Sequence, residues 1–252
     1  MRVLSIVHEH DAGPGVFADV AHERAEEVVE WIPARQAPPA AEGFEAALVF
    51  GGAMHVDQDD GHGWLPAEKQ LLRSLFGLGT PALGVCLGAQ LLAEVAGGGA
   101  RRMTQPEIGW TLVELTGEAA TDPLLGPLPA RFEGFQWHSY EASPPDGALS
   151  LARSDACLQA FSLTGAPWWG IQFHAEVTSE TIAGWIAGYR SDEDAVRANV
   201  NWDAVLLETN QKIARWNTRG IGICRRFLDH AASLRLAGAQ AGERSASADG
   251  AM

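Results

Sequence analysis

Short apolar runs alternate with segments of helical periodicity over the first hundred residues, and no other feature of the sequence restricts the fold as strongly. The apolar runs occupy 3–7, 45–52 and 81–86, and the helical segments occupy 15–31, 66–79 and 87–98. A short apolar run without alternation is typical of a strand that is buried on both faces, as in parallel sheets. Parallel neighbours need a long crossover, which is usually a helix. The pattern therefore predicts an α/β fold with a doubly wound, mainly parallel sheet.

The second half of the chain changes character. Short segments of alternating polarity predict antiparallel additions to the sheet at 111–116, 131–140, 148–154 and 157–163. A further strand at 168–174 and a helix at 178–189 complete one domain, 1–190, because no linker long enough to divide it is visible. Residues 191–236 have the pattern of a helical C-terminal extension, and 237–252 lack apolar periodicity, which predicts a disordered tail.

Composition excludes several classes of function. The formal net charge is −14, and the chain contains no cluster of basic residues of the kind that binds nucleic acid or an anionic membrane. The three cysteines, Cys86, Cys157 and Cys224, have neither disulfide-framework nor zinc-knuckle spacing. No apolar run is long enough for a signal peptide or a membrane span, so we expect a cytoplasmic protein with free thiols.

Cys86 lies in the stretch GVCLGAQ, at the predicted junction of a strand with a helix. The pattern G-x-C-x-G is typical of a nucleophile elbow, where flanking glycines let the chain and the substrate approach closely. The N-terminus of the helix that begins at Leu87 would favour the reactive thiolate. A buried cysteine in an ordinary strand–loop–helix turn fits the same pattern equally well.

His174 and Glu176 favour the catalytic interpretation. A cysteine nucleophile needs an imidazole to move its proton, and the imidazole needs an acceptor on its other nitrogen. If strand geometry persists through Glu176, the two side chains project in the same direction. A lone histidine at a strand end is more often structural, but a carboxylate two residues on and an elbow cysteine reverse that preference.

The segments GVCLGAQ, FHAE and VFGGAMH, in this order of importance, resemble the class I (triad-type) glutamine amidotransferases. The resemblance covers roughly 1–190 and is strongest to stand-alone proteins that resemble the amidotransferase domain of GMP synthase. It implies a flavodoxin-like fold, a catalytic set of Cys86, His174 and Glu176, and an oxyanion hole made by the backbone N–H groups of Gly52 and Leu87. Ala53 and Ala175 depart from the family pattern, but neither change removes a functional side chain.

The same resemblance implies a pocket for glutamine. Its expected members are Gln90, Gly109, Trp137, His138 and Ser139, with His138 in a non-catalytic role. Relatives often carry Gly-Asp where this chain has Ser139-Tyr140, so the acid that would contact the substrate ammonium is open, and Glu141 is one candidate.

The implied reaction is hydrolysis of the glutamine side-chain amide through a cysteinyl γ-glutamyl thioester, without a cofactor, releasing glutamate and ammonia. No phosphate-binding loop or synthetase domain is visible, so a separate synthetase subunit is the possible ammonia acceptor. Alternatives are a γ-glutamyl peptidase or hydrolase that acts alone, a non-catalytic regulatory or binding subunit, and a related cysteine peptidase. No metal site is expected, because the clustered residues 8–11 should face alternate directions on a strand end.

Overall fold

The computed structural model describes residues 1–249, and for 238, 239 and 241–249 it describes the backbone alone. A single nine-stranded sheet runs through it in the order β2-β1-β3-β4-β9-β8-β7-β5-β6. The strands are β1 (Arg2–Ile6), β2 (Glu27–Trp31), β3 (Ala46–Val49), β4 (Ala82–Val85), β5 (Gly99–Leu115), β6 (Arg131–Ser143), β7 (Leu149–Arg153), β8 (Leu158–Ser162) and β9 (Trp168–Ile171). The described helices are α1 (Phe17–Arg24), α2 (Leu65–Gly77), α3 (Leu87–Val95), the short 3-10 helix η1 (Glu118–Thr121), α4 (Ser179–Tyr189), α5 (Glu193–Ala198) and α6 (Trp202–Asp249).

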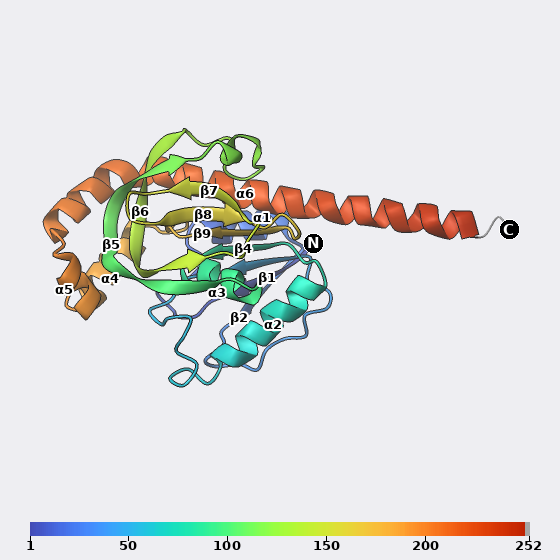
Figure 1. Ribbon diagram of the computed structural model, residues 1–252, viewed down its shortest axis with the longest axis horizontal. Coiled ribbons are helices and arrows are strands. Elements are labelled where there is room, and N and C mark those ends of the chain that lie inside the picture. Colours follow the sequence, from blue (N-terminus) through green and yellow to red (C-terminus); the bar gives the residue numbers. More distant parts are fainter. Residues whose placement is uncertain (250–252) are drawn as a thin grey trace.

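The sheet has a parallel half and an antiparallel half. Strands β2, β1, β3, β4 and β9 pair in parallel, whereas β8, β7, β5 and β6 extend the sheet by antiparallel pairing. This confirms the flavodoxin-like α/β class with antiparallel additions. The segments 106–110 and 111–116 belong to one long strand, β5, which pairs with β6 and bends around one side of the molecule (Figure 1).

Helices cover both faces of the sheet (Figure 1). Apolar side chains of α2 and α3 pack on one face with those of β1, β3 and β4, and those of α1, α4 and α6 pack on the other. Thr178 caps α4 through its side-chain oxygen, which accepts from the backbone N–H of Thr181, as the sequence pattern predicts. The C-terminal ends of the parallel strands therefore meet at one edge between two helical layers, where ligand sites of such sheets lie.

The C-terminal extension consists of α5 and the long α6, which runs along the sheet and projects beyond it (Figure 1). Trp216 of α6 is buried in the core, so the extension packs on the α/β domain. The backbone of α6 stays helical through Asp249, whereas the sequence predicts a disordered tail from residue 237; residues 250–252 lie outside the described part of the chain. The alanines of this segment have high helix propensity, so a helix can continue there without an apolar stripe to pack. The division into a domain 1–190, an extension and a tail stays a prediction.

Candidate active site

Cys86 occupies a strained turn between β4 and α3. Its backbone angles, φ 53° and ψ −111°, lie outside the regions that side chains other than glycine ordinarily adopt. A Cβ on Gly84 would lie 2.5 Å from backbone atoms of Gly88, and a Cβ on Gly88 would lie 2.0 Å from the carbonyl oxygen of Val49. The two glycines thus let α3 begin directly against β3 and β4, and this close packing holds the cysteine in the turn.

His174 and Glu176 lie just beyond β9, which ends at Ile171. The expected persistence of strand geometry to Glu176 is therefore wrong, yet the pair still forms, with 2.7 Å between Nδ1 of His174 and Oε1 of Glu176. Both side chains are buried. The backbone of His174 is fixed from two sides, since its N–H donates to the carbonyl of Phe135 and its carbonyl accepts from the indole of Trp216.

The electrostatics of His174 favour the imidazolium form. Burial by itself lowers the pKa of His174, but the negative charges of Glu176 and Cys86 outweigh burial and raise it to about 10. The ring packs edge-to-face on Trp185 at 4.8 Å between centroids. Its Nε2 has no hydrogen-bond partner among the described residues, so this nitrogen is available to a bound molecule.

The turn formed by Gly51 and Gly52 follows β3 and completes the site. A Cβ on Gly51 would lie 3.1 Å from Cε1 of His174 and 3.5 Å from Cβ of Cys86. One cavity of about 560 Å³ is lined by Gly52, Cys86, Leu87 and His174. The structure therefore brings together the cysteine, the histidine and both expected oxyanion-hole residues.

Most of the expected pocket residues line the same cavity. Gln90, Trp137, His138 and Ser139 do so, whereas Gly109 does not. Gly109 has φ 104° and faces Val205 of α6, so it serves the packing of the extension against β5. The expectation that Gly109 contacts the substrate thus lacks support from the cavity.

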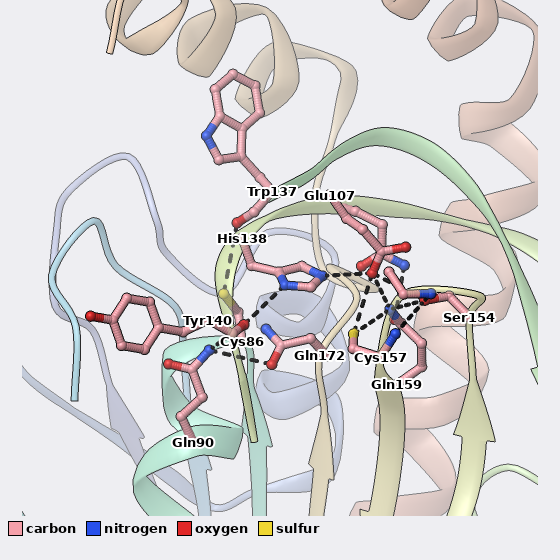
Figure 2. Close-up of polar contacts among 12 residues, drawn as sticks. Cys86, Gln90, Glu107, Trp137, His138, Tyr140, Ser154, Cys157, Gln159 and Gln172 are labelled. Carbon is pink, nitrogen blue, oxygen red and sulfur yellow. Dashed lines mark hydrogen bonds and ion pairs between the residues drawn. The ribbon is translucent and has the colours of Figure 1, made fainter. Parts of the chain in front are cut away.

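Polar contacts hold the Trp137–Tyr140 segment of β6 in place (Figure 2). The amide of Gln90 donates to the carbonyl of Tyr140 at 3.1 Å, and Nδ1 of His138 donates to the same carbonyl at 3.0 Å. Nε2 of His138 lies 3.4 Å from a carboxylate oxygen of Glu107. His138 therefore orients the segment behind the cavity, which fits a non-catalytic role.

A buried cluster around Glu107 lies behind this segment, and no motif in the sequence indicates it. The carboxylate is within reach of His138 and Cys157, a set that could hold a metal ion. However, the same carboxylate oxygen already accepts hydrogen bonds from Ser154, Cys157 and Gln159 (Figure 2). Burial raises the pKa of Cys157, so its sulfur stays a thiol. A buried carboxylate surrounded by donors is satisfied as it stands.

Acidic groups line the mouth of the cavity, and the sequence motifs do not predict them. They are Glu9, Asp11, Asp192, Glu193 and Asp194, and Arg102 is the basic residue among the lining side chains. Glu141, a candidate for the substrate ammonium, instead pairs with Arg101 at 2.7 Å and does not line the cavity. Asp194 belongs to α5, so the C-terminal extension contributes to the site, which no local motif could indicate.

Residues 8–11 do not converge on a common point. His8 contacts Glu68, the carboxylate of Glu9 accepts from the N–H of Ala53, and Asp11 accepts from Tyr189. The described residues include no helix that is both long enough and apolar enough to span a membrane.

The fold and the site together define an α/β protein whose elbow cysteine shares a cavity with a histidine–glutamate pair. The chain belongs to the class I glutamine amidotransferase family, whose model matches residues 17–184. It is 29% identical over 192 residues to the putative glutamine amidotransferase-like protein YfeJ of Salmonella typhimurium, covering 74% of this chain and 80% of that protein. It is 36% identical over 135 residues to one of the subunits of the glutamine-hydrolysing GMP synthase of Sulfolobus acidocaldarius, covering 52% and 67%.

Solved structures agree with this assignment. A glutamine amidotransferase from Methylobacillus flagellatus superposes with a TM-score of 0.81 at 25% identity, over 90% of this chain and 94% of that one. A glutamine amidotransferase from Thermotoga maritima superposes with a TM-score of 0.78 at 25% identity, over 90% and 98%. The resemblance to the amidotransferase domain of GMP synthase is thereby confirmed.

Proposed function

We propose that this chain hydrolyses the side-chain amide of glutamine through a γ-glutamyl thioester on Cys86. The observation that carries the proposal is that the unpartnered Nε2 of His174 opens into the cavity that Cys86 and Gly52 also line. Glu176 accepts from the other ring nitrogen, which fixes the orientation of the imidazole.

The reaction would proceed in two acyl-transfer steps. The thiolate of Cys86 attacks the amide carbon, and the N–H groups of Gly52 and Leu87 stabilise the oxyanion. Protonated His174 donates to the departing nitrogen, the carbon–nitrogen bond breaks, and ammonia leaves. Water then attacks the thioester carbon while His174 accepts its proton, and the carbon–sulfur bond breaks to release glutamate and restore the thiolate.

Glutamine hydrolysis is tested with purified protein and two measurements. The first is release of glutamate and ammonia from glutamine. The second is intact mass after exposure to a glutamine-mimic electrophile, with Cys86→Ala as the control. Cys157→Ala is a matched control for a second buried thiol outside the site. Absence of both products and of any label at Cys86 would contradict the proposal.

A γ-glutamyl hydrolase that acts alone is the second candidate, and the cavity favours it. The lining continues from Cys86 outward to Asp192 and Glu193 of the extension, which leaves room beyond the amide nitrogen for a larger leaving group. The acidic mouth would accept a leaving amine that carries a positive charge. Comparing kcat/KM for glutamine with that for γ-glutamyl amides and dipeptides distinguishes the two candidates.

A partner is part of the proposal. Because one relative is a subunit of a GMP synthase, we propose that a separate synthetase subunit receives the ammonia if free glutamine is the substrate. Cys86→Ser distinguishes this from a non-catalytic regulatory subunit, because it would stop ammonia-dependent product formation in the first case and leave the output of the complex unchanged in the second. We also propose a cytoplasmic location, since all three cysteines are free thiols, which a reducing compartment preserves.

A further inference from the structure

A second buried histidine–glutamate pair contacts the oxyanion-hole turn. Nε2 of His8, at the end of β1, lies 2.8 Å and 3.0 Å from the two carboxylate oxygens of Glu68 in α2. Its Nδ1 lies 3.0 Å from the carbonyl oxygen of Gly51. Both side chains have no exposed surface. The positions of His8 and Glu68 are 60 residues apart in the chain, so no sequence motif relates them.

The partners of His8 determine its protonation. A carbonyl oxygen and a carboxylate can only accept hydrogen bonds, so both ring nitrogens must donate. His8 is therefore an imidazolium, and a charged donor makes the hydrogen bond to Gly51 stronger than a neutral one would be. Although burial lowers the pKa of His8, the charge and hydrogen bond of Glu68 and the carbonyl of Gly51 raise it overall.

This hydrogen bond constrains one particular peptide unit. The carbonyl of Gly51 and the N–H of Gly52 belong to the same planar trans peptide, in which they point in opposite directions. Fixing the carbonyl toward His8 therefore directs the Gly52 N–H away from His8. That N–H donates to no protein atom among the described residues. Without such a bond the unit would rotate easily, because glycine on both sides permits nearly all backbone angles.

We propose that His8 and Glu68 are positioning residues that lock the Gly51–Gly52 peptide, so that the Gly52 N–H stays directed at the oxyanion formed on Cys86. This inference rests on the proposed hydrolysis by Cys86. The pair does not touch the substrate. Its effect is electrostatic preorganisation, because the hydrogen-bond donor is already oriented before charge develops in the transition state.

The principal variants are His8→Leu, which removes both hydrogen bonds, and His8→Gln, which keeps one neutral donor. We expect His8→Leu to lower kcat by on the order of 10²–10³-fold, the effect of losing one oxyanion-hole donor. KM should change little, because the ground-state amide gains little from that donor. His8→Gln should recover part of the loss.

A tetrahedral analogue separates positioning from general damage. Glutamate γ-semialdehyde forms a tetrahedral adduct with a thiol, and we expect its inhibition constant to rise in His8→Leu by a factor similar to the loss in kcat. The rate of Cys86 alkylation by iodoacetamide should stay unchanged, because that reaction develops no oxyanion. Lys69→Met is the matched control: Lys69 is the next residue of α2 and has a buried ion pair with Asp59 and Glu94, away from Gly51.

Two results would overturn the lock. One is a folded His8→Leu protein with wild-type kcat and wild-type aldehyde affinity. The other is a crystal structure of His8→Leu, or of Glu68→Gln if the first variant does not fold, in which the Gly51–Gly52 peptide keeps its orientation. The crystallographic readout needs no activity. If wild type itself hydrolyses no γ-glutamyl compound, the proposed function fails while the lock is still tested.

Discussion

Two buried histidine–glutamate pairs contact the Gly51–Gly52 turn, and they differ in what their histidines leave free. In the first, Nδ1 of His174 lies 2.7 Å from Glu176, and Nε2 has no partner among the described residues. In the second, Glu68 and the Gly51 carbonyl occupy both ring nitrogens of His8. A histidine can transfer protons only through a nitrogen that a substrate can reach. The same pair of residue types therefore serves chemistry in one place and orientation in the other.

The largest expected effect tests the chemical pair. His174→Ala removes the acid and base of both acyl-transfer steps, so we expect kcat for glutamine to fall by roughly 10⁴–10⁶-fold. His8→Leu should cost far less. Glutamate release at saturating glutamine gives both numbers. Equal losses in the two variants would break the distinction between chemistry and orientation.

Glu176→Gln should follow, with a loss of up to about 10⁴-fold in kcat. The amide keeps the size of the side chain but no longer stabilises the imidazolium or selects its orientation. The measurement is kcat for glutamine hydrolysis, with Glu180→Gln as a control on the exposed first turn of α4. Wild-type kcat in Glu176→Gln would place the orientation of His174 elsewhere, most directly in its backbone contacts with Phe135 and Trp216.

The different visibility of the two pairs in the sequence has a physical cause. His174 and Glu176 are two residues apart, so one local conformation brings them together, and a short motif can reveal them. His8 and Glu68 meet only because β1, β3 and α2 pack together, which no local pattern encodes. The parallel half of the sheet is predictable for the same reason, since its apolar runs and crossover helices are local features.

Predictions from the sequence fail where tertiary packing decides. Gly109 looks like a pocket residue by its motif, but the position of α6 assigns it to packing against Val205. Asp194 lines the cavity because α5 folds back over β5, and an isolated acidic helix gives no hint of that. The continuation of α6 past residue 237 is not predictable, because helix propensity alone, without an apolar stripe, is a weak signal.

Trp216→Phe tests how the extension supports the chemical pair. The indole N–H donates to the carbonyl of His174 at 2.8 Å, and its loss leaves a buried carbonyl without that donor. We expect the free energy of unfolding to fall by about 1–3 kcal/mol. Trp168→Phe is the matched control, because its buried indole donates to the carbonyl of Thr80 at 2.8 Å.

Both tryptophan variants should lose similar stability in urea denaturation, but only Trp216→Phe should also lower kcat. Its neighbour is the backbone of His174, whereas Thr80 precedes β4 at the opposite end of that strand from Cys86. A loss of kcat in Trp168→Phe of the same size would mean that general loosening, and not the contact with His174, is responsible.

The smallest expected effect is a slope in stability against pH. The pKa of His174 is raised in the folded protein to about 10 from 6.5. Between these values the folded state holds a proton that the unfolded state has released, so raising the pH favours unfolding. The stabilisation is complete below pH 6.5 and is lost as the pH rises through about 10, with a slope of about 1.4 kcal/mol per pH unit for one proton.

Two variants assign that slope to its source. His8 also has a raised pKa, with the same sign of effect, so wild type should lose stability more steeply than either His174→Gln or His8→Gln. Urea denaturation across this range measures each slope. Because Nε2 of His174 is unpartnered while both nitrogens of His8 donate, deprotonation of His8 must also break a hydrogen bond to Gly51 or Glu68. If alkaline pH opens the oxyanion turn before the protein unfolds, the bond to Gly51 is the one that breaks, and aldehyde affinity should fall earlier in wild type than in His8→Gln.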